Sequence, residues 1–383
     1  MDDMTVLARR PMLRWLVPLI AALLLGTTGA TIASLSASAR DSLAPRSASQ
    51  LLVDVQKAKV DGLSGTVVQT SDLGLPALPN IGGGSSSDFT SLVSGSHTLR
   101  LWYAGPTKAR LALLGDLGES DLIRNGSDVW LWSSGSNTAK HVTIPASADT
   151  PDPADATGTD APTTPQQAAD LALQAITPTT SVTTDPTAVV AGRPAYQLVL
   201  EPKDSSTLIG TVKIAIDGAT HIPTRVQVFP RGSSTPAFEV GFTSFNPHTP
   251  SDSVFSFNPP PGATVSEGLG TSGDHAQGSD PNDSTTPGAP SDLGTGTKPT
   301  VVGEGWTAVV VATLPTDQTA GGKPTTPLGS LDSVVKNLPT VSGTWGSGHL
   351  LKGTLFSVLL TDDGRVVAGA VDPDALYAAL SAG

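Results

Sequence analysis

The residue types that carry out catalysis are present in this chain, but their spacing matches no catalytic pattern. Ser64 lies in the run Gly-Leu-Ser-Gly over 62–65, which lacks the G-x-S-x-G spacing of a nucleophile elbow. Ser347 stands two residues before His349, a separation that nucleophilic catalysis does not use. Both serines are therefore predicted to be turn residues.

Metal ligands and cofactor-binding loops are not indicated either. The six histidines lie singly at positions 97, 141, 221, 248, 275 and 349, without an HExxH or His-x-His arrangement. Asp362-Asp363-Gly364 resembles the start of a calcium loop without the remaining ligands, and the glycines at 82–84 precede no helix that could bind phosphate. Cysteine is absent, which excludes disulfides and thiolate sites. We expect no enzyme, no metal and no cofactor.

Composition limits the partners and the fold class. The chain has 383 residues, with 22 Lys+Arg against 34 Asp+Glu and a net charge of -12. Such acidity argues against a nucleic-acid partner, because phosphate binding depends on clustered lysine and arginine. The 40 glycines and 32 prolines favour short strands and many turns, in about two folded units with linkers.

The N-terminus has the pattern of an export signal. Arginines within 9–14 precede an uncharged stretch over 15–38, and 37–39 reads Ala-Ser-Ala, as a signal peptidase requires. Residues 1–39 are therefore predicted to be a signal peptide, cleaved after Ala39, or an N-terminal membrane anchor, with the rest of the chain outside the cytoplasm. The arginines fit a twin-arginine signal and an ordinary charged region equally well.

Low-complexity segments divide the exported part into domains. Residues 75–87 form a Pro- and Gly-rich loop, and 145–164 are an insertion rich in Asp, Pro, Thr and Ala. Residues 266–300 are long, polar and aperiodic, so they are predicted to be a disordered linker. The domains expected on either side are 46–265 and 301–383.

The larger domain is predicted to be a curved antiparallel sheet with two helices. Apolar residues recur at helical spacing after Ser47 and over 165–176. Elsewhere the pattern alternates with period two, and Asn125-Gly126 marks a hairpin. The fold class is therefore mainly β (α+β), with one apolar sheet face. That face is covered either by a second sheet, as in a closed sandwich, or by the helices, as in a half-barrel with a helical lid.

The apolar face is also the predicted ligand-binding surface. Its predicted lining is Leu99, Leu101, Tyr103, Leu111, Leu113, Leu198, Leu200, Ile214, Val226, Val228, Phe238, Val240 and Phe242. Trp130 and Trp132 share a face of their strand, and the pattern leaves open whether they line the cavity or cover the outer side.

The smaller domain is predicted to alternate strands and helices (α+β). The expected strands are 306–314, 341–345, 355–360 and 366–370, and the expected helices are 328–338 and 372–380.

Several segments resemble the bacterial lipoprotein-carrier superfamily, that is, the LolA/RseB-like and LppX-like half-barrels. Together they extend the resemblance over about 47–265. The segments are 63–69 (LSGTVVQ), 124–132 (RNGSDVWLW), 190–203 (VAGRPAYQLVLEPK), 222–228 (IPTRVQV) and 252–265 (DSVFSFNPPPGATV).

The resemblance implies a curved sheet whose concave side is plugged by helices. It implies a non-enzymatic carrier or sensor that holds an acyl lipid or lipoprotein. The alternative is an RseB-like envelope regulator that binds a membrane-anchored anti-sigma factor, or another envelope protein, without lipid cargo. The segments 75–87 and 145–164 are not part of the minimal carrier. Without a lipobox cysteine, lipoprotein anchoring does not carry over. The smaller domain loosely resembles the appended domain of RseB-like regulators.

Overall fold

The computed structural model describes residues 43–75, 87–144, 164–268, 299–313, 335 and 337–381. The predicted export segment and most of the helix expected at 328–338 lie outside these residues, as do residues 269–298 of the expected linker. Within the described part, no helix is long and apolar enough to cross a membrane.

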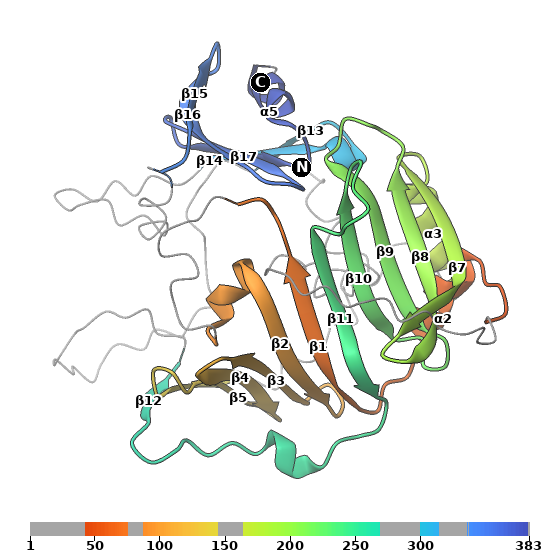
Figure 1. Ribbon diagram of the computed structural model, residues 1–383, viewed down its shortest axis with the longest axis vertical. Helices are drawn as coiled ribbons and strands as arrows, with labels where there is room; N and C mark the ends of the chain where they lie inside the picture. The colour runs from red at the N-terminus through yellow and green to blue at the C-terminus, as the bar shows by residue number, and fades with distance from the viewer. Residues whose placement is uncertain are drawn as a thin grey trace, which may run out of the picture.

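The larger domain is built on one curved, open sheet of twelve strands (Figure 1), which confirms the mainly β fold class. Its order is β12-β6-β5-β4-β3-β2-β1-β11-β10-β9-β8-β7. All neighbours are antiparallel except β12 and β6. The strands are β1 (Leu63–Ser71), β2 (Gly95–Tyr103), β3 (Lys108–Gly115), β4 (Gly118–Asn125), β5 (Asp128–Ser133), β6 (Thr138–Thr143), β7 (Thr180–Val190), β8 (Arg193–Pro202), β9 (Ile209–Asp217), β10 (Pro223–Pro230), β11 (Phe238–Asn246) and β12 (Thr264–Glu267).

Strand β1 joins two halves of the sheet. It pairs with β2 on one side and with β11 on the other, so β2–β6 and β7–β11 extend from it in opposite directions. Its pairing with β11 shifts register between Thr66 and Val67. Such a bulge increases the local twist and bend, and the two halves turn at a steep angle to each other (Figure 1).

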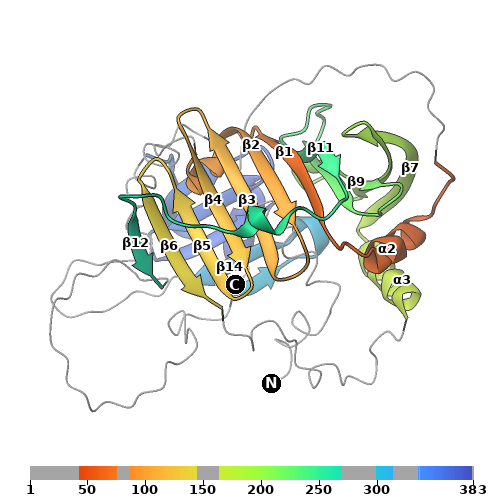
Figure 2. The same ribbon diagram turned by 90° about the horizontal axis from the view of Figure 1, so that it is seen from below.

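Both helices predicted for this domain are present. In α2 (Ala48–Lys57), Ser47 and Gln50 form a capping box. In α3 (Pro165–Ile176), Thr164 caps the helix and proline opens it. The helices pack against each other and lie beside β7–β9 (Figure 2).

In the part of the smaller domain that the structure describes, a six-stranded sheet is accompanied by helix α5 (Pro373–Ser381). Its strand order is β13 (Thr300–Val302), β14 (Val309–Thr313), β18 (Arg365–Gly369), β17 (Ser357–Thr361), β16 (Gly346–Lys352) and β15 (Thr340–Gly343).

Two details of this sheet differ from the sequence-based expectation. The strand expected over 341–345 ends at Gly343, and Gly346–Lys352 returns as a further strand, β16. Gly346 has φ +118°, in the region that favours glycine, so the chain reverses directly after the residues expected to end the strand. The strand expected from Trp306 begins at Val309, because residues 305–307 form a 3₁₀ turn.

The two domains pack on each other. Leu355 and Phe356 of the smaller domain join a buried cluster with Val228 and Phe238 of the larger sheet. Backbone bonds reinforce this contact, since the Leu208 amide donates to the carbonyl of Ala370 at 2.8 Å. The described parts of the two domains therefore share a core.

Candidate binding face

Strand register places almost all of the predicted lining residues on one face. Gln69 of β1 pairs with both His97 and Val240, which makes the face continuous across both halves because directly paired residues point to the same side. The residues on this face are Leu99, Leu101, Tyr103, Leu111, Leu113, Leu198, Leu200, Ile214, Val226, Val228, Phe238 and Val240.

Phe242 differs from these residues in what its side chain contacts. The register pairs it with Val67, which packs with Leu99 and Leu113 on the same face. Its ring, however, packs against a cluster formed by Val190, Ala195 and Ala215. Ala195 and Ala215 alternate with Tyr196 and Ile214, so they belong to the opposite face. The bulge in the β1–β11 pairing begins directly after Phe242.

Parts of the face are closed by other elements. Helix α2 covers Tyr196 and Ile216 through Leu51, and the smaller domain covers Val228 and Phe238. Over β2 and β3, the 3₁₀ helix η1 (Phe89–Val93) brings Leu92 against Leu99 and Leu113. Leu113 has no solvent exposure. These positions are core.

The next row across β2–β5 is not closed. Leu101 pairs with Leu111, Leu111 with Leu122, and Leu122 with Leu131. Leu101 and Leu111 are half-buried, whereas Leu122 is 42% and Leu131 40% exposed. We call these four residues the leucine row. Leu122 and Leu131 were not among the predicted lining residues, although the Asn125-Gly126 hairpin sets them opposite each other.

Basic residues border the leucine row. Lys140 of β6 pairs with Leu131 and continues the row, and its side chain is exposed. Arg124 lies in the adjacent row, paired with Ala109 and Val129, and its Nε donates to the Gly126 carbonyl at 3.1 Å. The apolar strip thus ends in positive charge.

The two tryptophans lie on the opposite face. Trp130 pairs with Ile123 and His141, and Trp132 is 6% exposed. Both rings contact Phe257, at centroid distances of 5.3 and 5.9 Å. The chain that follows β11 crosses β1–β6 on this side, and the smaller domain lies on the other side (Figure 2). The tryptophans therefore pack against the segment after β11 that covers this face of the sheet.

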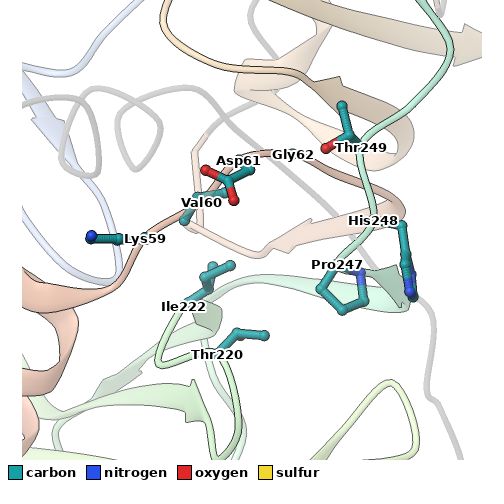
Figure 3. Close-up of a pocket in the computed structure, with 9 residues that line it drawn as sticks. All are labelled: Lys59, Val60, Asp61, Gly62, Thr220, Ile222, Pro247, His248 and Thr249. Carbon is teal, nitrogen blue, oxygen red and sulfur yellow. The ribbon is translucent and has the colours of Figure 1, made fainter.

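Two pockets in the described part of the chain lie away from the predicted lining residues. One, of about 240 Å³, is formed by the connection from α2 to β1, the turn before β10 and the segment after β11 (Figure 3). There Gly62 passes so close to Thr249 that a Cβ would come within 2.5 Å of its Cα. The other pocket, of about 270 Å³, lies beside Trp130.

The residues considered for catalysis have structural partners. Ser347 Oγ donates to the carboxylate of Asp362, and His349 lies with Nδ1 3.4 Å from the Leu338 carbonyl oxygen. Among the described residues, no three His, Asp or Glu side chains form a group that could hold a metal ion.

Comparisons with known proteins concern the fold. No protein-family model matches the chain, and no curated protein matches it. Matching solved structures include the complex of MucA and MucB from Pseudomonas aeruginosa, at 15% identity over 87% of this chain and 96% of that one, with a TM-score of 0.41. A LolA superfamily protein from Nitrosomonas europaea matches at 10% identity over 56% and 99%, with a TM-score of 0.20. A putative outer membrane lipoprotein-sorting protein domain from Vibrio parahaemolyticus matches at 8% over 54% and 97%, also with 0.20.

Proposed function

We propose that this chain is an extracytoplasmic, non-enzymatic binding protein that holds an acyl chain of a lipid or lipoprotein on the leucine row. The observation that carries this proposal is the exposure of Leu122 and Leu131, at 42% and 40%, beside a row that η1 covers. Contiguous apolar surface in contact with water is unfavourable, and exposed apolar patches mark binding sites.

The shape and charge of the row support a linear amphipathic ligand. The row crosses from β2 to β5, which is three strand spacings or about 14 Å at ~4.8 Å each. An extended acyl chain would lie along it and bury the exposed leucine surface, at about 25 cal/mol per Å². Lys140 at the β6 end would then meet an anionic head group.

The alternative ligand of the leucine row is an apolar segment of another envelope protein, such as a membrane-anchored anti-sigma factor. The favouring observation is that neither pocket described above is lined by a residue of the leucine row. An open strip on a sheet also fits the apolar side of a protein segment.

Thermal unfolding with and without dodecanoate tests the proposal. Ligand at a hundredfold excess over its dissociation constant stabilises the fold by about 2.7 kcal/mol, so the melting temperature should rise. Leu122→Glu should abolish the rise and still fold, because this side chain is already 42% exposed. Leu117→Glu is the matched control, since Leu117 is 96% exposed and outside the row.

The same experiment distinguishes an acyl ligand from a protein segment on the leucine row. If no acyl ligand shifts the melting temperature and no lipid is found by mass spectrometry of the exported protein, the acyl proposal is wrong. Capture of a membrane-anchored envelope protein by the wild type and by Leu117→Glu, but not by Leu122→Glu, would then support a protein segment as the ligand.

A further inference from the structure

We infer that the pocket beside Trp130 is a binding site for an organic ammonium group. It lies on the opposite face of the sheet from the leucine row and is independent of the proposed acyl site. Its volume is about 270 Å³, and its lining is Asn125, Asp128, Trp130, Phe255, Ser256 and Phe257.

Two aromatic rings at an angle form the apolar wall of this pocket. The rings of Trp130 and Phe257 are 5.3 Å apart at 53°. One side of the indole is stacked on His141 at 4.2 Å and 19°, and His141 is not part of the lining. Phe255, 1% exposed, anchors the segment that carries Phe257. The aromatic wall is therefore held in place before any ligand arrives.

The charged wall of the pocket is negative. Asp128 is half exposed, and its Oδ1 lies 2.9 Å from His141 Nε2. Glu267 of β12 contacts the other ring nitrogen of His141, also at 2.9 Å. Two nearby cations are paired with carboxylates: Lys108 with Asp252 at 2.8 Å, and Arg110, whose Nη1 reaches the Val254 carbonyl, with Asp121 at 2.8 Å. Aromatic faces combined with a carboxylate favour a cation, through the ring quadrupole and direct charge attraction.

His141 makes this charge depend on pH. The hydrogen bond to Asp128 is the chief cause that raises the pKa of His141, and burial opposes it while Glu267 adds to it. The charged groups facing this imidazole are Asp128 on β5 and Glu267 on β12. When protonated, His141 partly neutralises Asp128. Cation binding should therefore strengthen as the pH rises through the pKa of His141.

Calorimetric titration of the full chain with choline tests the inference. Choline should bind, whereas its uncharged isostere, in which carbon replaces the nitrogen, should not. Asp128→Asn removes the charge at nearly constant size and should weaken choline binding about tenfold, and the pH dependence should disappear. Asp204→Asn is the control, because it removes one exposed carboxylate that does not line the pocket and leaves the ion pairs beside the pocket intact. Its affinity for choline should remain that of the wild type.

Three results would overturn the inference. They are no choline binding by the wild type, equal binding of the uncharged isostere, and equal weakening by Asp128→Asn and Asp204→Asn. If choline binds as expected, competition by N-acetyl-lysine amide distinguishes a primary ammonium group of a peptide from the quaternary group of a small molecule or lipid head.

Discussion

Arg193 and Asp217 form a two-point ion pair between neighbouring turns of the larger sheet. Arg193 Nε lies 2.6 Å from Asp217 Oδ1, and Nη2 lies 3.0 Å from Oδ2. The chain reverses before Arg193 through Ala191 and Gly192, with φ of +49° and +76°. Asp217 is 1% exposed and also accepts hydrogen bonds from the backbone and hydroxyl of Thr220. The Gly-Arg turn of the superfamily resemblance thus satisfies a buried carboxylate.

Removing Arg193 should destabilise the fold more than removing a surface cation. Arg193→Leu leaves Asp217 buried without its ionic partner, and we expect a loss of about 3 kcal/mol in the free energy of unfolding. In the control Lys352→Leu, a pair exposed by 57% and 59% is lost, at a cost below about 1 kcal/mol. Urea unfolding measures both. Equal losses would mean that the donors of Ala219 and Thr220 satisfy Asp217 without Arg193.

His97 should make the protein less stable in mild acid. Burial lowers the pKa of His97, although a backbone hydrogen bond at Ser91 opposes the shift. The unfolded chain then binds a proton below about pH 6.5 that the folded chain resists. This contribution to stability is therefore present above that pH and is lost as the pH falls. His97→Gln should lose less stability between about pH 7 and pH 5 than the wild type. An identical pH profile for the variant and the wild type would contradict this expectation.

Cleavage of the predicted linker should not separate the two domains. A protease should cut first within 266–300, as polar aperiodic segments are the most accessible. The two pieces should nevertheless co-elute in size-exclusion chromatography, because Leu355 is buried against Val228 and Phe238. Leu355→Asp should release them, since an unpaired charge in that contact is very costly. The control Val301→Asp changes a 60% exposed residue and should leave the pieces together. Separate elution of the wild-type pieces would show that the interface is too weak to hold them.

A reporter fused after residue 383 should be active only if it functions outside the cytoplasm. The three arginines before the uncharged stretch favour retention of the N-terminal end inside and export of the rest. The same fusion without residues 1–39 is the control and should leave the reporter in the cytoplasm. Activity of a cytoplasm-only reporter on the full chain would disprove export.

The sequence alone determined which residues share a sheet face. Side chains alternate with period two along any strand, so Leu99 and Leu101 had to point to one side of their strand, and Leu111 and Leu113 to one side of theirs. The pairing of Leu99 with Leu113 places both pairs on the same face. The Asn125-Gly126 hairpin was readable for the same local reason, because its turn needs residues that tolerate positive φ. Helix boundaries at Ser47 and Pro165 also follow from local capping chemistry.

Only the tertiary structure decided what each part of that face does. Leu99 and Leu101 are two residues apart in one pattern, yet η1 covers the first while the leucine row beside the second remains partly exposed. Trp130 and Trp132 are covered by Phe257, more than a hundred residues further along the chain. Phe242 keeps the register of the face, yet its ring packs against Val190, Ala195 and Ala215, which lie on strands distant in sequence. Periodicity describes one strand at a time, whereas cover and exposure depend on contacts between segments distant in sequence.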